Sequence, residues 1–412
     1  MLTAKQAPPL LAGGLILVAM NLRPAAASIG PLLHRIQNDT GLSSGWAGVL
    51  TTLPVLCFGL LAPLAPVLAR RLGIRASIAA AMCVLLAGIL MRLIPGVGFL
   101  FVGTALAGAA IATGNVLVPV LVRRDFSHRT GIAMAIYSTA LIGFAALAAG
   151  LTVPLANALG AGWRSGLAVW AIPAAIAAVV WLPLLIRRTW RSSDGARGSV
   201  AAGSVAAGSA DASRPLPAHP ARGLLRSALA WQVTLFFALQ SGGFYATLAW
   251  LPSIFHSHGA SESTAGLLLS LSMVVGLAAA LTLPGLANRS RDQRLLVVGS
   301  CVLTAAGLLG ILVAPMSAPY LWTVLLGLGQ NAAFPLALML IVLRGGSVAS
   351  TEGLSTMAQG VGYALAALAP VAVGALHQTT QSWTPALTLL LTLVVAQLLI
   401  GLAAGRNRRV TG

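Results

Sequence analysis

The sequence predicts an all-α integral membrane protein with twelve transmembrane helices, arranged as two six-helix halves. Of the 412 residues, 58% are hydrophobic and only 8% carry a formal charge, whereas about 25% are charged in a typical soluble domain. A soluble fold of this composition could not cover its surface with polar groups. Because a membrane-crossing helix needs about 20 apolar residues, the chain has room for about a dozen crossings and their loops.

Apolar windows of helical length predict each crossing in turn, and each window is longer than the roughly 10 residues of a membrane β-strand. Helices are therefore the elements that satisfy the backbone within lipid. The first six are expected at Leu10–Leu32, Trp46–Ala69, Ala76–Ile94, Phe99–Val122, Gly131–Leu155 and Leu167–Ile186. The second six are expected at Trp231–Phe255, Ala265–Ala287, Leu295–Ala314, Tyr320–Leu343, Leu354–Leu376 and Pro385–Ala404.

The chain is expected to divide into an N-terminal half at 1–186, a flexible cytoplasmic linker at 187–226 and a C-terminal half at 227–412. The linker is rich in Ala, Gly, Ser and Arg and repeats Gly-Ser-Val-Ala-Ala at 198 and 203, a composition with little to bury. The halves resemble each other. Ala47-Gly48 and the later Pro66-Val-Leu-Ala-Arg-Arg71 recur at one offset as Ala265-Gly266 and Pro284-Gly-Leu-Ala-Asn-Arg289, which indicates a parallel duplication.

The net charge of +18 follows the pattern of a polytopic membrane protein. Nucleic-acid binding would need Lys and Arg gathered on one face or module, but here they form short clusters between apolar runs, so no nucleic-acid partner is expected. Most of the 25 basic residues fall in alternate connections on the side of the two termini, and only Arg35, Arg92 and Arg164 fall on the other side. The positive-inside rule then predicts cytoplasmic termini and a bacterial-type inner membrane.

No enzyme chemistry is apparent in the sequence. It contains no phosphate-binding loop, zinc-binding His-Glu-x-x-His helix, Gly-x-Ser-x-Gly elbow or paired carboxylates within a span. Cys57, Cys83 and Cys301 lie in apolar runs without metal-ligand spacing. We therefore expect no enzymatic activity, no metal and no cofactor.

Several motifs in the first two spans resemble a known family. They are Asn21-Leu-Arg-Pro24, Gly30-Pro-Leu-Leu33 and the run from Leu50 to Pro66. With them, the chain resembles a major facilitator superfamily transporter, and within it the cyanate permease and 2-nitroimidazole transporter branch. This resemblance implies the major facilitator fold and transport of a small anion such as cyanate, or export of a small nitro-heteroaromatic. The basic turn after the second span departs from the family pattern, because Arg70 stands where an Asp is usual.

Arg23 is the strongest candidate for a substrate-binding residue. It falls near the middle of the first span, where an ionised side chain costs about 2.5 to 3.5 kcal/mol or more, and no span interior supplies an Asp or Glu to neutralise it. Its planar fork suits an anionic substrate. The alternative is an Arg that snorkels to an interface or bonds the carbonyls freed by Pro24.

Polar and aromatic side chains in other spans are expected to complete the site. In the resembled fold the first, fourth, seventh and tenth spans line the central cavity, which makes their amides candidates to donate to an anion; helix-to-helix hydrogen bonding is their alternative role. Phe334, Tyr245 and Trp250 are candidates for an apolar wall, although aromatics in spans also serve packing. The full set of candidates is Arg23, Asn21, Asn115, Gln240, Tyr245, Gln330, Asn331, Phe334, Tyr137 and Gln359.

Together these features predict a secondary active or facilitative transporter, monomeric in the lipid bilayer. It is expected to move a cyanate-like anion or small carboxylate by alternating access, with Arg23 binding the substrate. The alternative is an exporter of drugs or nitroimidazole-like heteroaromatics. Because no span interior holds Asp or Glu, a cavity carboxylate is excluded as a proton carrier.

Overall fold

The computed structural model describes residues 9–61, 64–126, 130–160, 162–186, 221–289 and 292–408. Every regular element in these ranges is a helix, which confirms the predicted all-α fold. Ten of the described helical segments are long and apolar enough to cross a membrane, and an eleventh follows if the bent pair Gly13–Ala27 and Ile29–Thr40 is one crossing. Helix α12 (Ala228–Ser257) is not among these ten segments. It has 30 residues, enough to cross a membrane, and it carries the polar side chains of Gln240, Ser241 and Tyr245. Each of the twelve expected spans falls on a helix or on consecutive helices.

The described residues of the N-terminal half form ten helices, because several of its crossings are interrupted. They are α1 (Pro9–Asn21), α2 (Pro24–Ala27), α3 (Ile29–Thr40), α4 (Ser44–Leu61), α5 (Leu64–Leu72), α6 (Ile74–Met91), α7 (Val97–Asp125), α8 (Thr130–Leu159), α9 (Gly162–Ala168) and α10 (Ala171–Ile186).

The C-terminal half has fewer interruptions. After α12 come α13 (Glu262–Arg289), α14 (Arg294–Val313), α15 (Pro319–Arg344), α16 (Val348–Ala366), α17 (Leu368–Thr380) and α18 (Thr384–Ala404). The structure differs from the expected flexible linker at its end. Residues 187–220 lie outside the described residues, but Ala221–Arg226 forms the short helix α11, and Leu224 is buried near Gly353 of α16. One buried leucine is enough to anchor this turn against the bundle.

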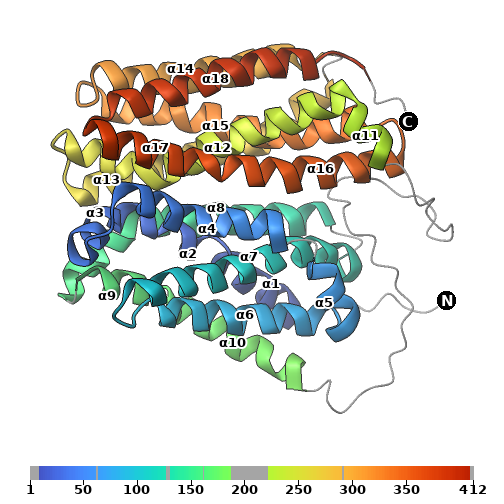
Figure 1. Ribbon diagram of the computed structural model, residues 1–412. Helices are drawn as coiled ribbons and strands as arrows, with labels where there is room; N and C mark the ends of the chain where they lie inside the picture. Colours follow the sequence, from blue (N-terminus) through green and yellow to red (C-terminus); the bar gives the residue numbers. More distant parts are fainter. Residues whose placement is uncertain are drawn as a thin grey trace.

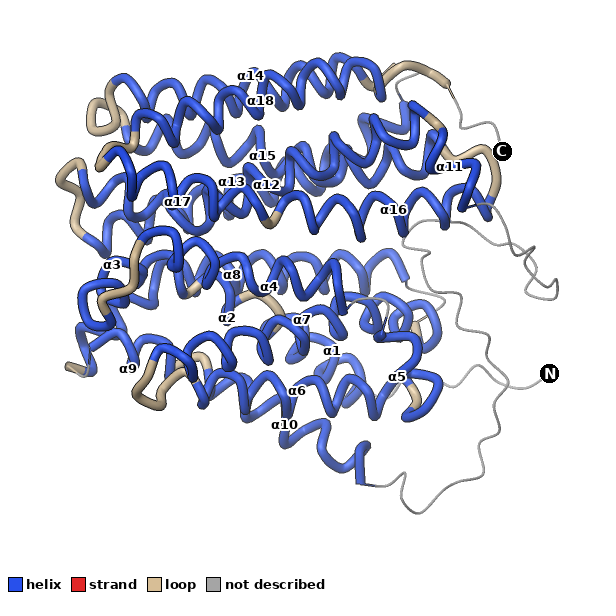
Figure 2. Tube along the Cα trace, viewed as in Figure 1, coloured by secondary structure: helices blue, strands red, loops and turns tan. Residues whose placement is uncertain are grey.

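The two halves lie side by side with their helices running in a common direction. Figure 1 shows α1–α10, in blue to green, as one group and α12–α18, in yellow-green to red, as the other; Figure 2 shows the same grouping as a tube. Helices α5 and α11 lie at one end of the molecule. We call this the proximal end. The opposite end, which carries α3, α9 and the turns at 41–43, 92–96 and 258–261, is the distal end.

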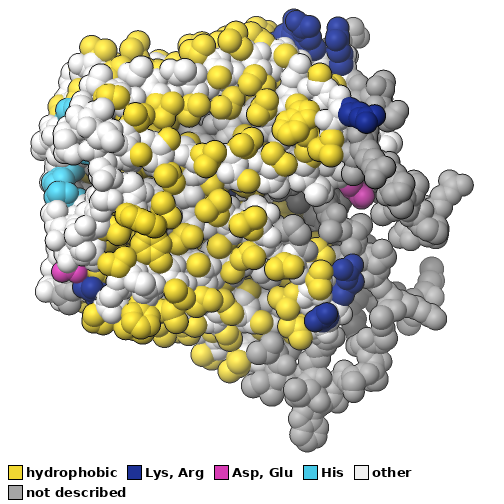
Figure 3. Space-filling view, viewed as in Figure 1, with side chains coloured by type: hydrophobic (Ala, Val, Ile, Leu, Met, Phe, Trp, Pro, Cys, Tyr) yellow, Lys and Arg dark blue, Asp and Glu magenta, His cyan; other side chains and the backbone are white. Residues whose placement is uncertain are grey.

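The outer surface is apolar over the length of the helices. Figure 3 shows hydrophobic side chains across the visible face and arginines gathered at the proximal end. Large side chains such as Leu60, Leu295 and Val313 are more than half exposed. In a soluble protein such a surface would aggregate, whereas lipid solvates it.

The halves meet tightly toward the distal end, where two glycines let backbones touch. A Cβ on Gly48 of α4 would lie 2.7 Å from the carbonyl oxygen of Pro370 in α17, and one on Gly266 of α13 would lie 2.7 Å from the carbonyl oxygen of Ala149 in α8. These glycines belong to the duplicated Ala-Gly pairs. The repeat therefore supplies equivalent close crossings in the two halves.

The basic turn after the second span, at residues 66–75, is joined by an ion pair to a carboxylate from a different part of the sequence. Arg75 Nη2 donates to Asp125 Oδ2 at the end of α7 over 2.9 Å, and Arg124 Nε donates to Asp125 Oδ1 over 2.8 Å. The family's acidic residue is replaced by Arg70, but this cluster places a negative charge beside the same turn.

Two arginines at helix ends are buried. Arg344 is 2% exposed, and its Nε donates to Ala404 O over 2.9 Å while its Nη2 donates to Gly405 O, so that it caps the end of α18. Arg92, expected at the external end of the third span, is 1% exposed. Its side chain folds back into the bundle, because Gly103 of α7 leaves space beside its stem.

Candidate functional site

Arg23 lies at a break near the middle of the first crossing. Helix α1 ends at Asn21 and α2 begins at Pro24, which has no N–H and whose ring prevents the preceding helix from continuing. The carbonyl of Arg23 accepts hydrogen bonds from Ala26 and Ala27 at 3.0 Å, so the chain restarts as a helix directly after it. The side chain is half-buried, and its buried Nε has no hydrogen-bond partner in the described residues. Its role in binding an anion stays a prediction.

Three tyrosines from both halves lie within electrostatic range of this guanidinium. They are Tyr137 in α8, Tyr245 in α12 and Tyr363 in α16. Tyr137 also donates from its hydroxyl to Asn115 Oδ1 of α7 over 3.4 Å. The region of Arg23 thus contains hydroxyl groups of the kind that can donate to an anion.

Two of these tyrosines, Tyr245 and Tyr363, belong to a continuous aromatic cluster. The ring of Tyr363 lies 6.4 Å from that of Tyr245, 5.8 Å from Phe58 of α4 and 5.0 Å from Phe237 of α12. The last two contacts are edge-to-face, a favourable geometry for aromatic pairs. Phe334, expected in an apolar wall, joins the cluster through Phe237 at 6.0 Å. Flat aromatic faces and a cation thus occupy one region.

The structure brings together Arg23, Asn115, Tyr137 and Tyr245 from the predicted set, and their role in binding stays a prediction. Tyr363, Phe58 and Phe237 were missed. Tyr363 had a usable signal, because a phenol in the middle of an apolar span is uncommon. The two phenylalanines had none, since nothing in an apolar run marks which ring faces inward.

Other predicted residues bond within the helix bundle instead. Asn21 Nδ2 donates to Leu17 O at 2.7 Å and to Pro173 O at 3.1 Å, which ties α1 to α10. Asn331 Nδ2 donates to Gly327 O at 2.9 Å, and the Asn331 side chain fills the space above Gly276. These contacts match the helix-to-helix role that was their alternative, and their role in substrate binding stays a prediction.

The predicted glutamines also have hydrogen-bond partners within the bundle. Gln359 Nε2 donates to Ser355 Oγ at 2.9 Å, one turn earlier in α16. Gln330 Nε2 donates to Thr247 Oγ1 at 2.9 Å, and Gln240 Nε2 donates to Ser241 Oγ at 2.5 Å. Trp250 donates to Pro370 O at 2.9 Å and packs on Trp383, so both contacts lie within the C-terminal half.

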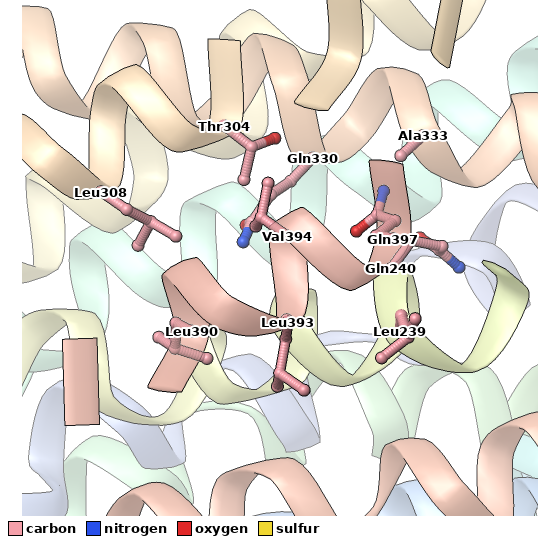
Figure 4. A pocket seen from close by; sticks show the side chains of 11 residues that line it. Leu239, Gln240, Thr304, Leu308, Gln330, Ala333, Leu390, Leu393, Val394 and Gln397 are labelled. Carbon is pink, nitrogen blue, oxygen red and sulfur yellow. The ribbon is translucent and has the colours of Figure 1, made fainter. Parts of the chain in front are cut away.

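Gln240 and Gln330 line a small cavity inside the C-terminal half. Figure 4 shows them with Gln397 of α18 and Thr304 of α14 among leucines such as Leu308 and Leu390. The cavity of about 10 Å³ has room for about one water molecule. It is a mainly apolar cavity with a few polar side chains, and it shares no lining residue with the Arg23 cluster. Gln397 was missed, although a lone amide in an apolar span was a readable signal.

The fold and this polar centre define a class of protein. Residues 14–367 match the family described as Major Facilitator Superfamily, and the chain belongs to that superfamily. It is thus a multi-pass membrane transporter of a small molecule. The assignment places it among transporters rather than enzymes.

Relatives refine the placement within the superfamily. The chain is 37% identical to the 2-nitroimidazole transporter of Escherichia coli (strain K12), over 97% of this chain and 96% of the relative. It is 32% identical to the cyanate transport protein CynX of the same organism, over 90% of each chain. It is 36% identical to the uncharacterized transporter YycB of Bacillus subtilis (strain 168), over 96% of this chain and 94% of the relative. The predicted resemblance to this branch is confirmed.

Solved structures agree on the fold. A point mutant of the nucleoside transporter NupG superposes with a TM-score of 0.73 at 13% identity, over 96% of this chain and 99% of that one. A D-xylose-proton symporter superposes with a TM-score of 0.71 at 14% identity, over 96% and 97% of the two chains. At these identities the likeness concerns the twelve-helix architecture alone.

Proposed function

We propose that the protein moves a small anion across the membrane by alternating access and that Arg23 binds the anion. The observation that carries this proposal is the Nε of Arg23, which has no partner among the described residues and lies at a helix break within electrostatic range of tyrosines of both halves. A substrate held there contacts both halves at once. Their relative movement is then coupled to its binding.

Charge balance favours an anionic substrate. In the described residues, Asp39, Asp125, Glu262 and Asp292 each form an ion pair with an arginine other than Arg23. Glu352 lies in the first turns of α16 at the proximal end. A guanidinium in the middle of a membrane protein without a carboxylate is costly, and a bound anion removes that cost.

The substrate class follows from the site together with the relatives. The named transporters of this branch move cyanate and 2-nitroimidazole. A cyanate-like anion or small carboxylate fits a single guanidinium with hydroxyl donors. Export of a nitroimidazole-like heteroaromatic is the second candidate, and the aromatic cluster of Phe58, Tyr245 and Tyr363 favours it, because its ring faces can stack on a planar ring.

The positions of the inter-half contacts support alternating access. The polar contacts that join the halves within the described ranges are Arg35–Glu262, the amide of Gly45 to Gln378 Oε1 at 3.0 Å, and Thr52 Oγ1 to Ala367 O at 3.1 Å. They run from the distal end to the middle. With the proximal end in the cytoplasm, as the arginine bias predicts, this is an inward-facing arrangement of a monomer in the inner membrane.

Uptake by purified protein in liposomes tests the proposal. Wild-type protein should transport cyanate or a small carboxylate such as formate, and Arg23→Ala should reduce the rate by about a hundredfold, because it removes a charged hydrogen-bonding partner. Arg226→Ala, in the exposed part of α11, is the matched control and should transport normally. Wild-type rates in Arg23→Ala would contradict the role of Arg23.

Measurements in cells that express the protein distinguish the two candidate functions. An anion importer raises cyanate accumulation in the expressing host. A heteroaromatic exporter instead raises resistance to 2-nitroimidazole and lowers its accumulation.

A further inference from the structure

A second buried arginine lies behind the break in the first crossing. Arg92 follows the last residue of α6, and its side chain is 1% exposed. Its Nη1 donates to the carbonyl oxygen of Ala25 in α2 over 2.6 Å. Arg92 thus contacts the short helix that directly follows Arg23.

The other edge of the Arg92 guanidinium has no protein partner in the described residues. Its Nε and Nη2 are both buried and form no hydrogen bond there. These two nitrogens form one side of the guanidinium fork, the side that binds an anion with two parallel N–H groups. Burying two such donors is costly unless they donate to an acceptor.

A second buried polar group without a partner lies in the same part of the chain. Ser28 is 1% exposed, and its Oγ has no hydrogen-bond partner in the part of the chain that the structure describes. Ser28 is the C-cap residue of α2, three residues after Ala25 in helical backbone. Residues three apart share one side of a helix, and Arg92 bonds the carbonyl of Ala25. Ser28 is therefore the candidate hydroxyl donor on the side of α2 that Arg92 contacts.

The surroundings set the charge and size of the missing acceptor. The carboxylates of Asp39, Asp125, Glu262 and Asp292 are paired elsewhere, so none of them balances Arg92. A Cβ on Gly103 of α7 would lie 2.9 Å from Arg92 Cγ, which shows how closely α7 packs on the stem of the side chain. Full burial and close packing suit a monatomic anion better than an organic acid.

We propose that Arg92 and Ser28 bind a single halide ion, chloride in the cell, behind the break in the first crossing. The ion accepts hydrogen bonds from Nε and Nη2 of Arg92 and from the Ser28 hydroxyl. It neutralises Arg92 and thereby holds the Ala25 carbonyl and α2 in place, next to Arg23. This site is separate from the proposed transport site and does not depend on what is transported.

The test is halide-dependent stability of the purified full-length protein. We expect Tm to rise saturably by a few degrees in sodium chloride or sodium bromide relative to sodium gluconate at equal ionic strength, since a ligand that binds only the folded state stabilises it. Ser28→Ala should weaken the apparent halide affinity severalfold, and Arg92→Gln should abolish the effect. Arg23→Gln should keep it, which distinguishes this site from the transport site.

A bromide-soaked crystal gives a direct readout that needs no variant. An anomalous peak within hydrogen-bond distance of Arg92 Nε and Nη2 would support the site. Equal Tm of the wild-type protein in chloride and gluconate would overturn it, since water would then fill the fork. A halide effect that is unchanged in Ser28→Ala and Arg92→Gln but lost in Arg23→Gln would overturn it as well.

Discussion

Arg35 of α3 and Glu262 of α13 form an ion pair that joins the two halves at the distal end. Arg35 also donates from Nη2 to Asn157 Oδ1 over 2.8 Å, so its guanidinium is held by α8 of its own half while it contacts the other half. The pair is partly exposed, with 28% of the Arg35 and 17% of the Glu262 side chain accessible. A partly exposed ion pair contributes only modest stability. The pair therefore stabilises the closed distal end but can break when this end opens.

Breaking this pair should favour opening of the distal end. Glu262→Gln is expected to shift the ratio of closed to open molecules about fivefold toward open, as for a partly exposed pair worth about 1 kcal/mol. Spin labels at Leu159 and Thr379, both exposed at the distal end of different halves, would report a longer distance. The double exchange Arg35→Glu with Glu262→Arg should restore the short distance. A distance distribution unaffected by Glu262→Gln would contradict the gating role.

A methyl group at Gly48 should have a stronger effect in the same direction. In Gly48→Ala the new Cβ would meet the backbone of Pro370, which cannot move aside as a flexible side chain can. The distal end then cannot close as in this structure, and we expect transport to fall at least tenfold while folding and membrane insertion persist. Gly98→Ala is the control, because a Cβ there has open space. Normal transport by Gly48→Ala would show that this close crossing is dispensable.

The three tyrosine hydroxyls around Arg23 should each contribute to substrate binding. Tyr137→Phe, Tyr245→Phe and Tyr363→Phe keep the ring contacts but remove a donor, so kcat/KM for an anionic substrate should fall about tenfold in each. Tyr320→Phe is a matched control, since Tyr320 is 62% exposed at the start of α15. If kcat/KM fell in Tyr320→Phe alone, or in none of the three variants near Arg23, the substrate would bind elsewhere.

The Asp125 cluster should give stability that depends on acid pH. Burial acts to raise the pKa of Asp125, but hydrogen bonds from Arg124 and Arg75 outweigh it and hold the pKa below the usual value of 3.8. A lowered pKa means that folding favours the ionised form, so the contribution is present above the usual pKa and is lost as pH falls through the folded-state pKa. The Tm of wild type should exceed that of Asp125→Asn by a constant amount between about pH 6 and pH 8.

Below about pH 4 this difference should shrink, because the wild-type carboxyl is then protonated as well. Glu352→Gln is the control, since Glu352 forms no ion pair in the described residues. A difference between wild type and Asp125→Asn that grows on acidification would contradict the assignment.

The connection between the halves should be dispensable for transport. Co-expression of residues 1–190 with residues 221–412 leaves α11 attached to the second half, where Leu224 is buried. Because the halves share an extensive interface, we expect them to associate and to transport at a rate close to that of the intact chain. Inserted and associated halves that transport nothing would assign the connection a regulatory role. Co-purification of the two fragments provides the control for assembly.

The sequence by itself determined the class of this protein. Twelve apolar runs, the arginine bias and the duplicated Ala-Gly pairs at Gly48 and Gly266 are local or periodic features, and hydropathy alone requires such runs to be helices in lipid. Arg23 was recognisable for the same reason, because a charged residue within an apolar run can be identified from the local sequence alone.

Only the tertiary structure decided which side chains share a site. Tyr363 lies far from Tyr137 in the sequence, yet both interact with Arg23, whereas Asn21, two residues from Arg23, turns away to Pro173. Arg92 likewise reads as a loop residue until its contact with Ala25 is seen. The direction in which a side chain points depends on helix rotation and on the packing of distant helices, and these are long-range properties that a local pattern of residue types does not contain.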